Sequence, residues 1–396
     1  MYDYIIVGAG SAGGVVAARL SEDPSTRVLV LEGGPPDDLP EIAMPAAAPT
    51  LWSGPLTWDN VTVPQRHAAR RVIPWPSGRA LGGSSSINGM LYIRGNPLDY
   101  DAWRDAYGCP GWSYLDVLPY FRRAEDQQRG ESRFHGTGGP LRVEDQRYEH
   151  PLSRAWLEAA VASGLPRNED FNGARQDGVG HYQMTQRDVR RWSVSDAYLR
   201  PAMQRPNLTV ETDAHVTQVI IEGDRATGVR YVRDGATREA SATGEVVVAS
   251  ADPAAKPIVD PAYFTDETDL EVLVAGVRMA REIAAREPLA DITAGEVAPG
   301  EDLDDDERVR DWVRATAGTM FHPTGTCAMG GSAEAVCDPE LRARGVEGLR
   351  VVDASVMPAT PRGNTNAPTI AVAERAADLI RGDTPLSPAA LERELA

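Results

Sequence analysis

The sequence predicts an α/β fold, in which a Rossmann-like βαβ domain with a parallel sheet is joined to an α+β domain of reduced size. The first indication is residues 3–8, where β-branched residues run straight into Gly8, as in a buried parallel strand. A small-residue helix over 14–21 and a second strand over 27–32 complete a βαβ unit. The length of 396 residues, 42% of them hydrophobic, allows two domains, or one large domain with an insertion.

The turn between this first strand and the helix carries a dinucleotide fingerprint. Gly8 permits a tight turn, Gly10 lets the backbone approach a pyrophosphate, and Gly13 allows the helix to pack closely on the strand. The free N–H groups of the helix N-terminus favour phosphate. Glu32 ends the second strand, where a carboxylate accepts hydrogen bonds from ribose hydroxyls and repels the 2′-phosphate of NADP. The fingerprint alone does not separate NAD from FAD.

The middle of the chain predicts a mixture of helix and antiparallel strand. An amphipathic helix is expected over 152–163, ended by Gly164 as a left-handed cap. Residues 208–232 and 237–250 indicate a β-meander. A long helix is expected to start near Asp266 or Thr268, with a buried face that contains Leu270, Leu273, Val274, Val277 and Ile283.

The last third of the chain predicts a return to the parallel sheet. The acidic residues 301–307 indicate the first turn of a helix, stabilised by the helix dipole, in preference to a metal site. A buried strand is expected over 349–353 and a helix over 369–381. The final dozen residues are expected to form an exposed helical tail.

Composition limits the classes of function. A net charge of −18, spread along the chain, argues against binding to nucleic acid and to anionic membranes. Three cysteines without a CxxC pair fit a reducing compartment better than a disulfide framework. No leader precedes the first strand and no run of 18 apolar residues occurs, so we expect a cytoplasmic protein. A single lysine among many arginines suggests a bacterial genome rich in GC.

Two further clusters are candidates for cofactor contact. Residues 82–89 combine glycine and serine with Asn88, whose amide can bond the edge of a flat ring system, although a surface loop has the same composition. The loop around His322 presents one histidine among small residues, either as a base or as a buried, satisfied imidazole. Asp353 follows a predicted strand, and residues 363–369 open the last helix with Pro368 in its first turn.

The start of the chain, residues 78–103 and residues 321–380 resemble the glucose–methanol–choline (GMC) oxidoreductase family. The resemblance implies FAD lying across the N-terminal domain, with His322 facing the flavin N5 position. Asn366 stands where some members have a second histidine and others an asparagine. Ile87 stands where some members carry a histidine linked covalently to flavin, so non-covalent FAD is expected.

The resemblance also implies a reaction and a set of contacts. His322 would take the hydroxyl proton of an alcohol while hydride moves to flavin N5, and Asn366 would donate a hydrogen bond to the developing alkoxide. No metal site is expected. The residues expected to hold the cofactor are Gly8, Gly10, Ser11, Ala12, Gly13, Glu32, Gly82, Gly83, Ser85, Asn88, Gly89, Met90, Val216, Asp353, Ala354, Asn366, Pro368 and Thr369.

The sequence departs from this family after Ala251, where a long internal segment is absent. We expect a discontinuous FAD-binding domain over 1–139, 201–253 and 315–396, and a reduced substrate-binding domain over 140–200 and 254–314. The missing part would normally roof the active site, so the flavin is expected to be open to water or covered by a partner subunit. Three hypotheses remain. The first is oxidation of an alcohol by an FAD-dependent oxidase or dehydrogenase. The second is another flavin reaction, namely a lyase, a decarboxylase or a tailoring oxidation of a bulky substrate, and the third is a flavin-binding protein without catalysis.

Overall fold

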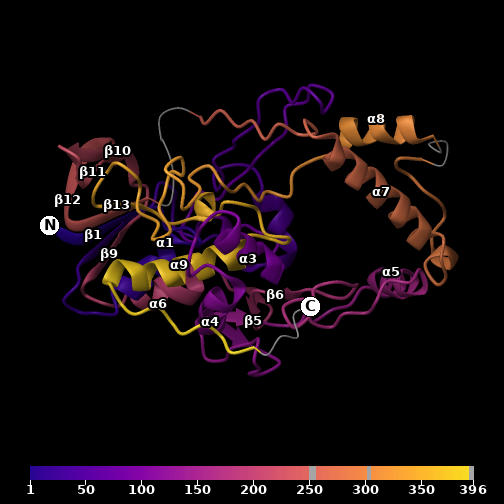
Figure 1. Cartoon of the computed structure of the whole chain (residues 1–396), viewed down its shortest axis with the longest axis horizontal. Coiled ribbons are helices and arrows are strands. Elements are labelled where there is room, and N and C mark those ends of the chain that lie inside the picture. The colour runs from indigo at the N-terminus through magenta and orange to yellow at the C-terminus, as the bar shows by residue number, and fades with distance from the viewer. Residues whose placement is uncertain (249–255, 301–304, 392–396) are drawn as a thin grey trace.

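The computed structural model describes residues 1–248, 256–300 and 305–391. Its centre is a seven-stranded sheet of order β10-β11-β12-β1-β2-β9, with β13 paired to β12 (Figure 1). The pairings β1–β2, β2–β9, β1–β12 and β12–β13 are parallel, and β10–β11–β12 is an antiparallel meander. The sheet strands are β1 (Tyr2–Val7), β2 (Val28–Leu31), β9 (Leu208–Glu211), β10 (His215–Glu222), β11 (Arg225–Arg233), β12 (Ala236–Val248) and β13 (Leu349–Val351).

Helices and short two-stranded ladders fill the rest of the described chain. The helices are α1 (Gly13–Leu20), α2 (Pro40–Ala43), η1 (Pro45–Leu51), η2 (Gly83–Ser86), α3 (Pro97–Asp105), α4 (Tyr114–Ala124), α5 (Pro151–Ala162), η3 (Ser195–Leu199), α6 (Arg200–Ala202), α7 (Glu267–Ala284), η4 (Ala290–Ile292), α8 (Asp306–Thr316), η5 (Ala354–Val356) and α9 (Asn366–Arg381). The short strands are β3 (Leu91–Tyr92), β4 (Glu125–Gln127), β5 (Leu141–Val143), β6 (Gln183–Met184), β7 (Gln186–Arg187) and β8 (Arg190–Arg191).

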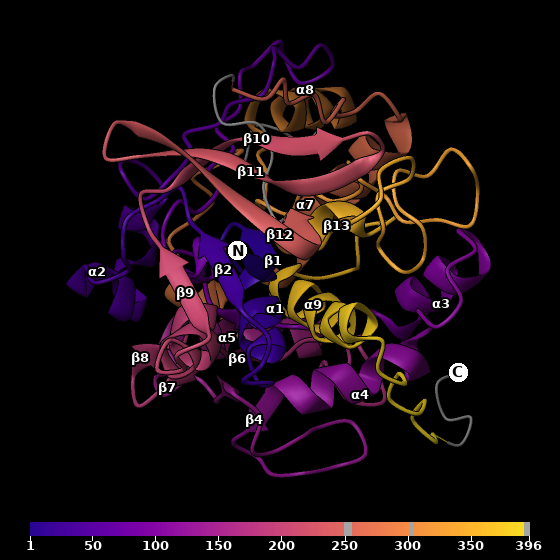
Figure 2. The ribbon, with the colours of Figure 1, turned by 90° about the vertical axis from the view of Figure 1, so that its left-hand side faces the viewer.

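The parallel sheet is buried on both faces, which explains why its strands are continuously apolar. Ile6 of β1 packs with α1 and α9, whereas Ile5 and Val7 pack with the meander. Figure 2 shows the same order of layers, with α1, α4 and α9 on one side of β1 and β10–β11 on the other. This three-layer arrangement confirms the predicted α/β fold with a βαβ unit.

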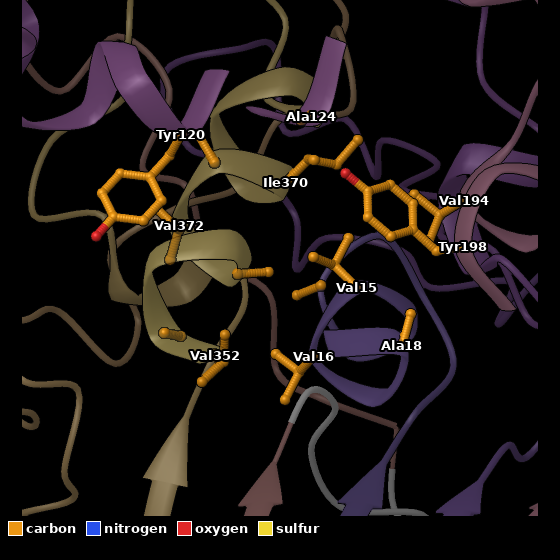
Figure 3. Packing of buried hydrophobic residues seen from close by; sticks show 14 of the residues in the cluster. Val15, Val16, Ala18, Tyr120, Ala124, Val194, Tyr198, Val352, Ile370 and Val372 are labelled. Carbon is orange, nitrogen blue, oxygen red and sulfur yellow. The ribbon is translucent and has the colours of Figure 1, made fainter. Parts of the chain in front are cut away.

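The helical layer holds α1 and α9 side by side, which fixes the two helix N-termini relative to each other (Figure 3). Val15 and Val16 of α1 are fully buried, and burial of each contributes about 1.5–3 kcal/mol. Glu374 of α9 has no exposed surface and accepts hydrogen bonds from Arg19 of α1 at 2.9 Å and from Arg123 of α4 at 2.7 Å. A buried carboxylate with these charged partners ties three helices together.

The opposite end of the molecule is formed by α5, α7 and α8 (Figure 1). Residues from α5 and α7 share a small apolar cluster with Leu289, and a second cluster joins α7 to α8. The Asp266 side chain accepts a hydrogen bond from the Thr268 N–H and caps α7, as the sequence indicates. Among the described residues, no helix is both long and apolar enough to cross a bilayer.

Three predictions about secondary structure are corrected. Residues 208–211 form β9, which pairs with β2 in the parallel sheet and lies outside the meander. Leu273 on α7 is 44% exposed, because α8 and α5 cover only part of that helix. The tail is not helical over 384–391: it runs in extended form along α4, where the Ala389 N–H donates to the Leu115 carbonyl at 2.9 Å.

The acidic stretch is confirmed in its described part as the start of a helix. Asp305 caps α8 by accepting from the Glu307 N–H at 2.9 Å, while residues 301–304 lie outside the described residues. The predicted junction after Ala251 also lies outside them. The chain resumes beside the N-terminal part, where Lys256 Nζ donates to the Asp59 carbonyl at 2.8 Å.

Candidate functional site

The glycine turn after β1 has the geometry that a dinucleotide fingerprint requires. Gly8 has a φ of 97°, which favours glycine, and Ala12 precedes α1 as its N-cap. A Cβ on Gly13 would lie 1.9 Å from the Gly8 carbonyl oxygen, so only glycine lets α1 approach β1 this closely. A Cβ on Gly10, in contrast, would meet only the Gly83 Cα, at 3.8 Å. The backbone at Gly10 therefore borders free space.

Glu32 lies beside this turn with its carboxylate almost fully buried. Its Oε2 accepts from the Ala9 N–H and its Oε1 from the Gly34 N–H, each at 2.8 Å. Burial raises the pKa of Glu32 to about 7, and these two N–H groups oppose the rise. Hydroxyl donors from a ribose would favour the ionised form further, so the predicted role of Glu32 fits its surroundings.

The start of β10 lies against the same strand end. The Ala214 N–H donates to the Glu32 carbonyl at 2.9 Å, and Val216 follows two residues later. The Trp58 and His215 rings lie 5.7 Å apart, and both would meet a Cβ on Gly33. Val216 is thus placed near Glu32, together with an aromatic pair that the sequence did not single out.

The second glycine cluster packs directly on the first. A Cβ on Gly83, at a φ of 53°, would lie 2.7 Å from the Gly10 Cα, and Gly82 also has a positive φ. Ser85 Oγ donates to the Gly82 carbonyl at 2.6 Å and closes η2. A Cβ on Gly89 would meet no atom within 4 Å. Backbone at Gly10 and Gly89 thus leaves room for a ligand, whereas Gly83 and Gly13 are needed for packing.

The third cluster joins them at the N-terminus of α9. Ser11 Oγ donates to Asn366 Oδ1 at 2.8 Å, although these residues are 355 positions apart. The contact occupies the amide oxygen of Asn366 and leaves its NH₂ as the donating group. Thr365 provides no side-chain cap, Pro368 lacks an N–H, and Thr369 Oγ1 bonds the Thr365 carbonyl at 2.7 Å. The first N–H groups of α9 are therefore suited to negative charge.

His322 lies on a strained turn next to the second cluster. Phe321 has a φ of 65°, and its ring packs 5.7 Å from the ring of Trp52, which donates from Nε1 to the Ile87 carbonyl at 2.9 Å. The Nε2 of His322 is buried and has no hydrogen-bond partner among the described residues. Burial lowers the pKa of His322 below its usual value, against a smaller opposing effect of the Phe321 carbonyl. The imidazole is therefore neutral and free to accept a proton.

Asp353 and Ala354 make their contacts within their own turn. Asp353 accepts from the Ser355 N–H at 2.8 Å and caps η5 directly after β13. Burial raises the pKa of this carboxyl. Their place after a parallel strand is the one expected for a cofactor contact. Among the described residues, no hydrogen bond joins Asp353 or Ala354 to the three glycine-bearing clusters, so their contact with the cofactor stays a prediction. The proximity of His322 to Asn366 also stays a prediction.

Sequence reasoning missed Arg191, whose guanidinium lies under the second cluster. It is 2% exposed and donates to Asn88 Oδ1 at 2.8 Å and to the Ser85 carbonyl at 3.3 Å. Nothing in the sequence around it marks an arginine that is buried. A surface hollow of about 530 Å³ lies elsewhere, between residues 66–69 and α8, and includes none of the predicted site residues.

The residues in these clusters fit FAD. Two glycines leave room beside the backbone, and two helix N-termini offer N–H groups. Glu32 stands where the fingerprint predicts a ribose contact, and His322 Nε2 is a buried nitrogen without a partner among the described residues. The surroundings of Asn88 and Met90 agree with this fit. The Met90 N–H donates to Asn88 Oδ1 at 2.9 Å, at a left-handed φ of 62°.

Comparison with known proteins identifies relatives over nearly the whole chain. Two family models, both described as GMC oxidoreductase, match residues 2–259 and 240–373. Human mitochondrial choline dehydrogenase is 34% identical over 97% of the chain and 90% of its own length, and an alcohol dehydrogenase [acceptor] of Pseudomonas putida is 33% identical over 96% of each. Pyridoxine 4-oxidase from Mesorbium loti superposes with a TM-score of 0.92 at 28% identity, covering 97% of this chain and 100% of that one.

The alignments confirm that a long internal segment is absent. The alignment with human choline dehydrogenase extends over 538 residues, whereas this chain has 396, so part of the relative has no counterpart here. The two family-model matches overlap at residues 240–259, which includes the predicted junction after Ala251.

Proposed function

The chain belongs to the GMC oxidoreductase family, and from this premise we propose that it oxidises an alcohol with His322 as the base and Asn366 as the donor to the substrate oxygen. The family consists of FAD-dependent flavoproteins that act on CH–OH groups. The observation that carries the proposal is the buried Nε2 of His322, which has no partner among the described residues. A neutral imidazole nitrogen held dry and free is suited to accept a hydroxyl proton.

Each group of the site then has a defined task. His322 Nε2 accepts the proton of the substrate hydroxyl. The Asn366 NH₂ donates to the same oxygen as negative charge develops on it, because Ser11 occupies the amide oxygen. FAD, when bound, supplies the acceptor for the hydride that leaves the carbon. Trp52 and Phe321 pack against each other at the turn that carries His322, with ring centroids 5.7 Å apart.

The cofactor would be held by the chain's own backbone and a few side chains. The turn at Gly10 and the N-terminus of α1 would take the pyrophosphate, Glu32 the ribose, and the loop from Ser85 to Met90 the flavin ring. We infer that binding is non-covalent, because Ile87 has no atom that could link to the flavin. The N-terminus of α9 would stabilise negative charge on the reduced ring.

We also infer that α5 and α7 belong to one reduced substrate domain, formed by 140–200 and 254–314. Their shared apolar cluster, which includes Ala159 and Ile283, supports this division. The absence of the segment that would roof the site favours substrates larger than choline or pyridoxine, the compounds named in the relatives.

Anaerobic reduction of the purified holoprotein by a panel of alcohols tests the proposal. The panel includes choline, pyridoxine, benzyl alcohol, a series of n-alkanols and a bulky secondary alcohol, with dithionite as the control for a reducible flavin. We expect at least one alcohol to bleach the visible flavin band, and peroxide formed on adding oxygen then distinguishes an oxidase from a dehydrogenase. If dithionite bleaches the band and no alcohol does, alcohol oxidation is wrong.

A further inference from the structure

Arg191 of β8 connects three segments from within the protein. Its Nε donates to the Ile42 carbonyl at 2.9 Å, and its Nη1 donates to the Ser85 carbonyl and to Asn88 Oδ1. The side chain is 2% exposed. Burial lowers the pKa of Arg191 to about 10, so the guanidinium remains charged at neutral pH. The negative charge of Asp196 opposes this lowering of the pKa, and within the described part of the chain the guanidinium donates to two carbonyl oxygens and one amide oxygen.

The Nη2 of Arg191 is buried and has no hydrogen-bond partner among the described residues. An unpaired N–H of a buried charged group is costly, so buried arginines normally satisfy all their donors. Nη1 of this guanidinium is directed to the loop at 85–88, whereas Nε is directed to the Ile42 carbonyl. The remaining group is therefore available to an acceptor atom of a ligand held by that loop.

Arg191 also determines which way the amide of Asn88 points. Asn88 Oδ1 receives two donors, the Met90 N–H at 2.9 Å and Arg191 Nη1 at 2.8 Å. Neither a backbone N–H nor a guanidinium can accept a hydrogen bond, so the oxygen of the amide must face them. The NH₂ of Asn88 is consequently turned the other way, as a donor.

We propose that Arg191 is a positioning and binding residue for the flavin, which orients the Asn88 NH₂ toward the ring edge and donates from its own Nη2 to an acceptor atom of FAD. This inference rests on the proposed FAD site. FAD is rich in acceptors for such donors, namely phosphate oxygens, ring carbonyls and ring nitrogens. A buried cation at this place also stabilises the reduced, more negative flavin.

The test is titration of the full-length apoprotein with FAD, followed by flavin fluorescence. Arg191→Met is expected to weaken FAD binding roughly 100-fold, since it removes charge-assisted donors from a dry site. Arg191→Lys keeps the charge but loses the planar fork, and we expect a loss of about tenfold. Arg190→Met, an exposed neighbour on the same strand, is the matched control and should bind FAD within about twofold of the wild type.

A double-mutant cycle separates positioning from mere structural support. Asn88→Ala should weaken FAD binding about tenfold in the wild-type background but no more than about twofold in the Arg191→Met background, because the amide is no longer oriented there. The midpoint potential of bound FAD should become more negative in Arg191→Met. Thermal unfolding of each apoprotein monitors folding, and if Arg191→Met does not fold, Arg191→Lys decides.

The outcomes distinguish this inference from the proposed function. A wild-type protein that binds no FAD overturns both. If the wild type binds FAD and the Arg191→Met variant binds it equally well, the inference alone is wrong. If Arg191→Met is unfolded, Arg191→Lys replaces it in this comparison. Independent, multiplicative effects of Arg191 and Asn88 would show that Arg191 does not act through the amide.

Discussion

Replacement of His322 by alanine is expected to slow anaerobic flavin reduction by an alcohol about 10²–10⁴-fold, because the hydroxyl proton then has no acceptor at Nε2. The affinity for FAD and the flavin spectrum should stay close to those of the wild type, since His322 does not contribute to the glycine-rich grip. Stopped-flow absorbance gives the rate constant for reduction, and fluorescence titration gives the affinity.

His67→Ala is the control for this experiment, because His67 is exposed and lies in a loop away from the predicted site. It should reduce flavin at the wild-type rate. Equal reduction rates in His322→Ala and His67→Ala would remove His322 from the mechanism.

The same base has a predictable pH dependence. Burial lowers the pKa of His322 in the folded protein, so Nε2 is unprotonated at neutral pH and becomes protonated only as the pH falls through that lowered value. The rate constant for reduction should therefore be constant around neutral pH and decrease only as the pH falls below the usual titration range of histidine. His322→Gln should lose this acid limb together with most of the rate.

Substitution of Gly10 should affect FAD binding, whereas substitution of Gly13 should affect folding, because only Gly13 is packed tightly against other atoms. Gly10→Ala is expected to fold as the wild type does, because its new Cβ would meet only the Gly83 Cα, at 3.8 Å. The methyl group would nevertheless occupy the space where the backbone approaches the pyrophosphate. We expect FAD affinity to fall roughly 100-fold while the stability of the apoprotein changes by less than about 1 kcal/mol.

Gly13→Ala should act mainly on the stability of the apoprotein. Its Cβ would lie 1.9 Å from the Gly8 oxygen and 3.2 Å from Ile6 Cγ2, so α1 must move away from β1. We expect the apoprotein itself to lose about 2–3 kcal/mol of stability. Urea unfolding of both apoproteins and FAD titration of those that fold measure the two effects. If Gly10→Ala binds FAD as tightly as the wild type, the pyrophosphate is not held at this turn.

The parts that sequence could predict are those encoded locally. The turn at Gly8–Gly13 and the cap of α7 at Asp266 depend on neighbours within a few residues, so their patterns are visible in the chain. The exposure of Leu273 was not predictable, because helical periodicity describes a face and does not say how much of it another element covers. The tail at 384–391 likewise depends on contacts with α4, far away in sequence.

The same distinction holds in the site. Glu32, Asn88 and His322 stand in motifs, and the structure places them in surroundings that agree with their predicted roles. The link from Ser11 to Asn366 and the contacts of Arg191 join segments that are far apart along the chain, and no local pattern marks them. The residues that we propose to hold the cofactor lie before and after the predicted junction at Ala251, so the absence of an internal segment need not remove them.

The proposed FAD site is tested by the flavin content of the purified full-length protein, measured after incubation with FAD and removal of free cofactor. We expect a yellow protein with one FAD per chain, and acid precipitation should release this FAD completely and intact into the supernatant. A correctly folded protein that remains colourless would show that the three clusters do not hold FAD, and flavin that stays with the precipitate would show that binding is covalent.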